Sequence, residues 1–178
     1  GSRGVGNKIA KKHIKIAQRL CEQWWIPLPN KDLAYLVQGT PEFKAYLQDL
    51  KWAQRFAFLN REEMMDRFAD CLEEFMGQEL VEMERINCHH NYTVKEKHFG
   101  HEVWLTRKGA VNAAEGRKAL IPGSMGTASY VVEGKGYPGG LMSAPHGEGR
   151  RFYRTEARRR FTVDDLAARM EGIEYRPG

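Results

Sequence analysis

One histidine of this sequence lies in a setting that suits covalent chemistry on a phosphate. His146 stands within the run Ser143-Ala144-Pro145-His146-Gly147-Glu148-Gly149-Arg150. Pro145 favours extended backbone in the residue before it, so we expect a strand that ends just before the histidine. The glycines leave bare backbone N–H groups, and together with Arg150 these could hold phosphate oxygens while a ring nitrogen attacks phosphorus. A plain turn with a surface histidine is the alternative, and these residues alone do not separate the two.

A second histidine stretch, Cys88-His89-His90-Asn91-Tyr92, could bind a metal ion. Imidazole is a common ligand for manganese, zinc and iron, and a neighbouring amide such as that of Asn91 can orient a phosphate or a ribose. Adjacent side chains on a strand point to opposite faces, so one histidine could enter a given site, and Cys88 would face the same way as His90. Two histidines and a thiol that are simply satisfied within a sheet remain the alternative.

Two further features favour an anionic ligand. The turn Ile121-Pro122-Gly123-Ser124-Met125-Gly126 offers consecutive N–H groups and a hydroxyl that could cradle a nucleotide, although no GxxxxGK[ST] loop is present. Six arginines lie between Arg150 and Arg160, opposed there by Glu156 alone. Such a run is usually a solvated helix face, but beside a histidine that reacts with phosphate it favours a track for a polyanion backbone.

The composition fits a soluble globular protein. The chain has 178 residues, of which 42% are hydrophobic and 29% charged, and its net charge is +5. No apolar run approaches the length of a membrane span. The three cysteines form no CxxC pair, so we do not expect a disulfide framework. We expect a cytoplasmic location, where thiols stay reduced.

The first half of the chain predicts helices. Residues 8–24 carry apolar side chains at helical spacing, whereas Gly1–Asn7 reads as a glycine-rich loop that could hold an anion beside Arg3, or as a frayed tail. Thr40 and Pro41 suit a helix start. The pattern from there to Gly77 fits one long helix or two in line, with Met64 and Met65 in the core and Cys71 on the buried face.

The second half predicts antiparallel strands separated by glycine turns, and two short helices at its end. The alternating segment 80–86 leads straight into 87–92, and further strands are expected at 93–98, 101–107, 118–122, 127–133 and 140–144. A short helix is expected at 156–160, and another from Thr162 with Asp165 in a capping box. The fold class is therefore α+β, with a helical first half packed on a largely antiparallel second half.

These elements, in this order, resemble the C-terminal half of the RtcB family of RNA ligases. The family carries an HSGSRGxGN stretch, a WAQxxAxxNRExM helix, a CHHNY segment, a TRKGA turn, an IPGSMG loop and an SHGAGR loop. The corresponding stretches here are Gly1–Asn7, Trp52–Met64, Cys88–Tyr92, Thr106–Ala110, Ile121–Gly126 and Ser143–Arg150. The match covers essentially the whole chain, so residues 1–178 are expected to form the C-terminal portion of one RtcB-like catalytic domain, with 1–77 mainly helical and 78–178 mainly β.

The resemblance implies an enzyme that uses GTP and manganese to join an RNA 3′-phosphate or 2′,3′-cyclic phosphate to a 5′-hydroxyl, in RNA repair or tRNA splicing. His146 would attack the α-phosphorus of GTP and become guanylylated, and His90 would be a manganese ligand. An archease-type activator would be a partner. The family's contacts to GMP fall on His90, Asn91, Pro122, Gly123, Ser124, Met125, Ser129, His146, Gly147, Glu148 and Gly149.

The resemblance also assigns Arg3, Arg150 and Arg154 to RNA phosphates. We expect these arginines to act on phosphate charge and not on bases, because the sequence places none of them among aromatic residues that would stack with a base.

The sequence departs from the family pattern in ways that set up a second hypothesis. The family's other metal ligands lie upstream of the stretch that matches Gly1–Asn7, and its guanine-contacting lysine lies near its last residue, whereas this sequence stops at Gly178. Glu148 and Pro145 also replace other residues within the histidine loop. One imidazole does not hold manganese tightly. The alternative function is therefore a non-catalytic fragment that binds RNA or nucleotide.

Overall fold

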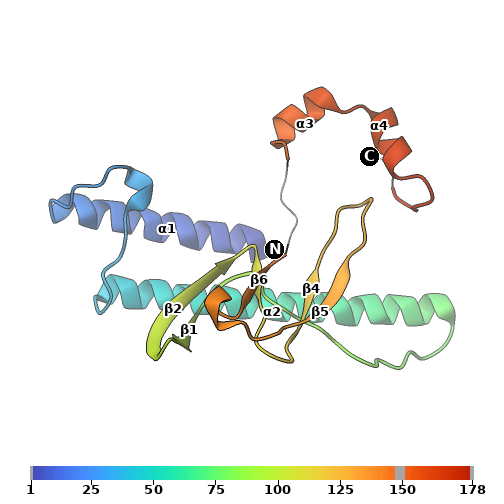
Figure 1. Cartoon of the computed structure of the whole chain (residues 1–178), viewed down its shortest axis with the longest axis horizontal. Helices are drawn as coiled ribbons and strands as arrows, with labels where there is room; N and C mark the ends of the chain where they lie inside the picture. The colour runs from blue at the N-terminus through green and yellow to red at the C-terminus, as the bar shows by residue number, and fades with distance from the viewer. Residues whose placement is uncertain (1, 147–150, 177–178) are drawn as a thin grey trace. The chain divides into compact units, whose positions relative to one another are not determined.

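The computed structural model describes residues 2–146 and 151–176, without the side chains of Ser2 and Arg3 (Figure 1). Its long helices come first and its antiparallel strands later, so the α+β class that the sequence predicts is confirmed. The chain divides into two compact units, Gly1–Asn87 and Cys88–Gly178. Among the described residues, no helix combines the length and the apolar character that crossing a membrane requires.

The first helix, α1, spans Ser2–Gln23. It confirms the helix predicted over 8–24, but the loop predicted for Gly1–Asn7 is wrong, because the helix already begins at Ser2. Extending an existing helix backward adds one hydrogen bond per residue without a new nucleation step. That gain offsets the roughly 1 kcal/mol that each of Gly4 and Gly6 costs within a helix.

The second helix, α2, runs without a break over Pro41–Met76. Of the two arrangements that the sequence allows, one long helix is therefore the correct one. Its start is the predicted one, because the side chain of Thr40 accepts a hydrogen bond from the N–H of Phe43 at 3.2 Å. Gly77 ends the helix with φ at +66°, in the left-handed region that a residue without Cβ adopts most readily.

The core of the first unit lies between α1 and α2, which run side by side in Figure 1. Asp49 of α2 joins the two helices, because its Oδ2 lies 2.8 Å from Nε2 of His13 and 2.9 Å from Nζ of Lys12. A short 3₁₀ helix, η1 (Lys31–Leu33), lies in the connection between them. The buried side chains of α1 recur at helical spacing, as an amphipathic helix requires: His13, Ala17, Leu20 and Cys21.

The second half of α2 is less covered than its sequence predicts. Met64 is 62% exposed and Met65 49%, and Cys71 is exposed as well. The core positions predicted for these three residues are therefore wrong in this structure. The reason is length: α1 has 22 residues and α2 has 36, so α1 cannot cover the whole apolar stripe of its neighbour.

The segment 80–86 is not a strand, although its alternating sequence predicts one. It is tied to α2 by side chains instead of a backbone ladder. Nη1 of Arg85 lies 2.5 Å from Oδ1 of Asp66, and the backbone N–H of Leu80 donates to Oε1 of Glu73 at 2.9 Å. Alternation marks any extended segment with one covered face, and a strand needs in addition a partner strand to bond with.

The second unit contains three two-stranded antiparallel sheets. The first is a hairpin of β1 (Asn91–His98) and β2 (His101–Lys108), joined by Phe99 and Gly100, both with positive φ. Such turns match the twist of the flanking strands. The other sheets pair β3 (Ala110–Asn112) with β6 (Ser143–Pro145) and β4 (Lys118–Ile121) with β5 (Tyr130–Glu133).

Most strands lie where the sequence predicts them, with shifted ends. Strand β5 begins at Tyr130 instead of 127, and β6 covers 143–145 instead of 140–144, because Pro138–Gly140 forms a 3₁₀ helix, η2. Strand β3 is not predicted at all. His90 precedes β1 instead of lying on it, so the argument that alternate residues of a strand face the same way does not apply to the histidine pair.

Two short helices follow, α3 (Arg154–Arg160) and α4 (Val163–Arg169). Both are predicted, including the capping box of α4: the N–H of Asp165 donates to Oγ1 of Thr162 at 3.2 Å, and Oδ2 of Asp165 accepts from the N–H of Thr162 at 2.7 Å. These hydrogen bonds hold the pKa of Asp165 below its ordinary value. Local capping signals of this kind fix helix starts without help from the rest of the fold.

Candidate active site

The two histidine segments meet at a sharp corner between β2 and β3. The backbone N–H of His146 donates to the carbonyl of Gly109 at 3.1 Å, and the N–H of Ala110 donates to the carbonyl of His90 at 3.2 Å. The N–H of Gly109 donates to Oδ1 of Asn91 at 2.9 Å. Three hydrogen bonds at one corner therefore fix two segments that lie more than fifty residues apart in the sequence.

The rings of His90 and His146 lie next to each other. Their centroids are 5.5 Å apart and their planes make an angle of 67°, an edge-to-face contact. The side chain of His90 is exposed, whereas His146 is half-buried. His89 lies elsewhere, with its ring 5.3 Å from that of Tyr92. Of the two adjacent histidines, it is thus His90 that the structure brings to His146.

Nδ1 of His146 is buried and has no hydrogen-bond partner among the described residues. Nε2 points toward the backbone of Gly109. An imidazole can attack an electrophile through only one nitrogen at a time, and the other then carries the proton. Because Nδ1 is enclosed, Nε2 is the nitrogen that this conformation leaves for chemistry.

Glycine is required at the corner. Gly109 has φ at +65°, where a side chain is strained, and a Cβ placed on it would lie 3.4 Å from Nε2 of His146. The sequence marks Lys108-Gly109 as a turn but does not reveal that this turn carries both histidine segments. The corner is a positioning element that sequence reasoning missed.

A buried arginine supports the strand that leads to His146. Arg107 of β2 is 2% exposed, and its guanidinium reaches the neighbouring strand β1 and the start of β6. It forms a bidentate pair with Glu96, at 2.8 and 2.9 Å, and donates to the hydroxyl of Tyr92 at 2.9 Å. On the other side its Nε donates to Oγ of Ser143 at 2.8 Å. A buried charge is tolerated only when it is paired and bonded in this way.

The electrostatics of this cluster agree with a pair that is charged at neutral pH. The pKa of Glu96 lies below its ordinary value of 4.5, chiefly because Arg107 donates hydrogen bonds to it. Burial by itself would lower the pKa of Arg107, but its bonds to Glu96 and its interaction with Tyr92 outweigh burial and raise the pKa. His98, which is also buried, lies 2.9 Å from Oε2 of Glu96 through its Nε2.

Arg107 also holds a strained turn. Leu141 and Met142 have φ at +53° and +49°, a conformation that non-glycine residues keep only where their surroundings fix it. The guanidinium donates to both of their carbonyls, at 3.2 and 3.3 Å. The turn leads directly into β6, which ends at Pro145 as the sequence predicts. Arg107 thereby fixes the direction from which His146 enters the corner.

The Pro122–Ser129 loop, predicted to cradle a nucleotide, uses much of its hydrogen-bonding capacity internally. The N–H of Gly123 donates to Oγ of Ser129 at 3.0 Å, and the N–H of Ser124 donates to Oγ1 of Thr127 at 2.7 Å. Two of the N–H groups that the sequence offers to a nucleotide, those of Gly123 and Ser124, are therefore engaged within the loop itself. A side chain at Gly123 would collide with the carbonyl of Ala128. Pro122, Ser124, Met125 and Ser129 are exposed and remain accessible to a ligand.

Several predicted site residues lie outside the described residues. These are Gly147, Glu148, Gly149 and Arg150, together with the side chain of Arg3. Their assignments stay predictions. Arg154, by contrast, is described: it is exposed and begins α3.

The described residues do not supply a complete metal site. Among them there is no group of three or more His, Cys, Asp and Glu side chains that could hold a metal ion. His90 therefore fits manganese as a single imidazole ligand and no more. Manganese prefers several oxygen or nitrogen ligands, so these residues alone do not fit a resident manganese ion.

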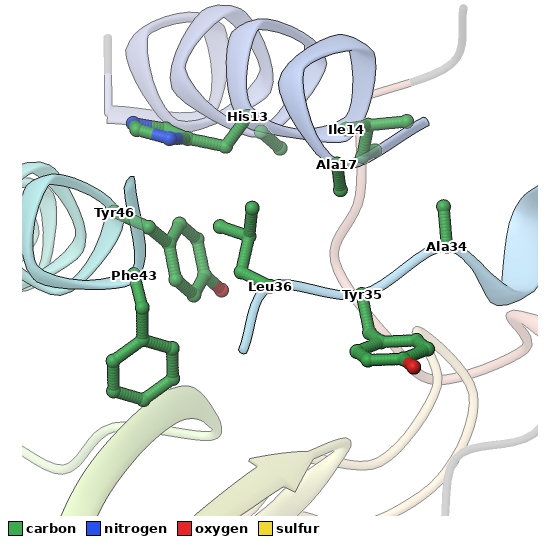
Figure 2. A pocket seen from close by; sticks show the side chains of 9 residues that line it. His13, Ile14, Ala17, Ala34, Tyr35, Leu36, Phe43 and Tyr46 are labelled. Atoms are coloured by element: carbon green, nitrogen blue, oxygen red, sulfur yellow. The ribbon is translucent and has the colours of Figure 1, made fainter. Parts of the chain in front are cut away.

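The first unit has a cavity of its own, of about 320 Å³, that sequence reasoning did not predict (Figure 2). Helix α1 contributes His13, Ile14 and Ala17 to its wall, and Tyr46 of α2 lies edge-on to His13, with ring centroids 5.2 Å apart. Burial raises the pKa of Tyr46. Nearly all of the other lining side chains are apolar, so the cavity carries no arrangement of groups that indicates chemistry: Ala10, Ala34, Tyr35, Leu36 and Phe43.

Comparisons with known proteins relate this chain to one family. A family model described as tRNA-splicing ligase RtcB matches residues 1–177. The protein named RNA-splicing ligase RtcB1 from Escherichia coli (strain ATCC 25922) is 44% identical over 181 residues, which cover 99% of this chain and 44% of that protein. The tRNA-splicing ligase RtcB of Methanopyrus kandleri is 31% identical over 203 residues, covering 96% of this chain and 20% of that protein. The chain thus spans less than half the length of these relatives.

Proposed function

The chain belongs to the RtcB family, and on that premise we propose that it is the portion of an RNA ligase that carries the nucleophile, His146. The substrates proposed are an RNA with a 3′-phosphate or 2′,3′-cyclic phosphate and an RNA with a 5′-hydroxyl. GTP and manganese are the proposed cofactors, RNA repair or tRNA splicing in the cytoplasm is the proposed role, and an archease-type activator is a proposed partner.

The observation that carries this proposal is the corner at Gly109, where His90 and His146 are held in edge-to-face contact. In the proposed reaction Nε2 of His146 attacks the α-phosphorus of GTP, so that a P–N bond forms and pyrophosphate leaves. The RNA 3′-phosphate then takes the GMP from His146 and frees its ring. Attack by the 5′-hydroxyl on the activated 3′-phosphate finally joins the ends and releases GMP.

The residues around the histidines have supporting roles in this proposal. Asn91 accepts from the N–H of Gly109 through Oδ1, which leaves its amide nitrogen to donate to a phosphate or ribose oxygen. Pro122, Gly123, Ser124, Met125 and Ser129 would contact GMP through the outer surface of their loop. His90 would supply one ligand of a metal site that residues outside this chain complete, and a metal there would neutralise charge on phosphate oxygens.

The test is self-guanylylation of the full-length protein. Incubation with α-labelled GTP and Mn²⁺ should give a covalent, acid-labile label, because phosphoramidate bonds to histidine hydrolyse in acid. His146→Ala should abolish the label. His101→Ala, on the exposed end of β2, is the matched control and should keep it. A label that persists on His146→Ala would show that another residue is the nucleophile.

The absence of a three-ligand cluster among the described residues favours a second candidate function, a non-catalytic portion that binds RNA or nucleotide. The two functions separate in one experiment on the 178-residue chain and the full-length protein side by side. If neither acquires label while both bind RNA, the binding function holds and the ligase function fails.

A further inference from the structure

Helices α3 and α4 line a groove in which only Arg154 has been given a role so far. Its volume is about 610 Å³, and both helices contribute to it. Its lining combines apolar side chains, among them Ala157, Phe161 and Leu166, with arginines. The full lining is Arg151, Phe152, Arg154, Ala157, Phe161, Asp165, Leu166 and Arg169.

The charge of this groove favours an anionic ligand. Three arginines and one carboxylate line it, so the lining has a net charge of about +2. The carboxylate of Asp165 is engaged by the N–H and the hydroxyl of Thr162, at 2.7 and 2.8 Å. Arg154 is exposed and has no ion pair among the described residues, so its guanidinium is available to a phosphate.

The aromatic rings of the groove favour a ligand that also has a flat apolar surface. Two guanidinium groups already lie over the Phe152 ring. That of Arg160 is 4.6 Å from the ring centroid, and that of Arg151 is 5.6 Å from it. Phe161, 5.9 Å from Phe152 between centroids, is 46% exposed. Phe161 is therefore the ring with open surface, and it lies beside arginines. Arg154 lines the same groove as Phe152 and Phe161.

We propose that this groove binds one unpaired nucleotide of the RNA substrate, with the base against Phe161 and the backbone phosphate on Arg154 and Arg169. Stacking of a base on an aromatic ring combined with arginine contacts to phosphate is how proteins hold single-stranded nucleic acid. A base within a duplex could not enter, because its faces are covered by its neighbours. The proposal rests on the proposed function, since it names a site for that same RNA.

The test uses the full-length protein without GTP and a short RNA with a 3′-phosphate. The fluorescent base 2-aminopurine replaces each of the last four nucleotides in turn, because stacking quenches its fluorescence. Phe161→Leu, which keeps an apolar side chain, should remove the quench at one position and weaken binding about tenfold. It should leave the salt dependence of binding unchanged. Tyr153→Leu, an exposed aromatic outside the groove lining, is the control and should behave like the wild type.

Each other outcome overturns the proposal. Equal loss in both variants would mean that the effect is not specific to the groove. If Phe161→Leu lowers the stability of the protein but leaves the fluorescence quench and the RNA affinity unchanged, then Phe161 packs against another part of the protein and does not contact RNA. A loss of GTP labelling in Phe161→Leu would assign the groove to the mononucleotide. Guanylylation of the wild type without RNA tests the proposed function separately, so a labelled wild type with no quench at any position refutes this inference alone.

Discussion

The corner at Gly109 and the groove between α3 and α4 are built in opposite ways. At the corner, backbone hydrogen bonds and a 2%-exposed arginine hold the histidines. In the groove, arginines are exposed and the shape comes from two seven-residue helices, of which α4 begins with a capping box. One region fixes atoms relative to one another, and the other offers charge and a flat apolar surface.

This difference predicts how each region responds to change. Removing a member of a buried network leaves its partners unsatisfied, so the effect should be large and insensitive to salt. Removing one exposed arginine leaves neighbours that still attract phosphate, so the effect should be small and strongly salt-dependent.

Replacing Arg107 should give the largest change. Arg107→Met leaves Glu96 charged without its partner and should lower the free energy of unfolding by about 3–5 kcal/mol, as measured by urea denaturation of the full-length protein. Arg107→Lys should recover little of this lost free energy of unfolding, because an ammonium group cannot form the bidentate pair with Glu96. Arg67→Met, which breaks the exposed pair with Glu63, is the control and should cost only about 0.3–0.5 kcal/mol.

The double variant Arg107→Met with Glu96→Gln sharpens the interpretation. If the cost arises from the unpaired carboxylate, the double variant should be more stable than Arg107→Met alone. Additive losses in the two single variants would show that Arg107 contributes mainly through the carbonyls of Leu141 and Met142.

Gly109→Ala should reduce guanylylation more than it reduces stability. The added Cβ comes into van der Waals contact with Nε2 of His146, and the strain of a side chain at φ of +65° is relieved by a shift of the corner that carries this ring. Displacing a reacting atom by about 1 Å can lower a rate about 10²-fold. The single-turnover rate of label transfer is the measurement. Gly116→Ala, also at positive φ but with open space around its Cβ, is the matched control. Equal rate losses in both would attribute the effect to backbone strain alone.

Acid should weaken the pairing of Glu96 with Arg107. The pKa of Glu96 is depressed in the folded protein, so its contribution to stability is fully present above its ordinary value of 4.5 and is lost as pH falls through the depressed value. The difference in unfolding free energy between wild type and Glu96→Gln should therefore shrink as pH falls from 6 to below 4. Glu133→Gln on β5 serves as the comparison. A constant difference across this range would contradict the assignment.

Arg154→Gln should give the smallest effect. We expect severalfold weaker RNA binding, similar for RNAs of different sequence, and a salt slope reduced by about one unit. Filter binding at several salt concentrations measures both. Arg158→Gln, on the same helix but outside the groove lining, is the control. It should weaken RNA binding less than Arg154→Gln does, and an equal loss of affinity would attribute the effect to net charge alone.

Features set by neighbouring residues could be predicted from the sequence. The cap of α2 by Thr40, the capping box of α4 and the β1–β2 hairpin all rest on residues within a few positions of one another. The end of β6 just before His146 likewise follows from Pro145. Their physical causes are local, so the sequence shows them directly.

Features set by distant contacts could not be predicted. Arg107 bonds to residues 11 to 36 positions away, and nothing in the alternation of β2 distinguishes it from an exposed arginine. Strand β3 has three residues and exists because β6 pairs with it. The family resemblance indicated that His90 and His146 share a site, but it gave no reason for Gly109 to join them.

The left-handed pair Leu141 and Met142 has a consequence for motion. The carbonyl of Met142 accepts from the N–H of Ala113 at 2.8 Å as well as from Arg107. If the guanidinium releases these carbonyls, the two residues can relax to ordinary backbone angles, and the β3–β6 ladder opens with them. The amide protons of Ala113 and His146 would then exchange with solvent in a single cooperative event instead of independently. The corner would open as one unit, on the slow timescale of a local unfolding step.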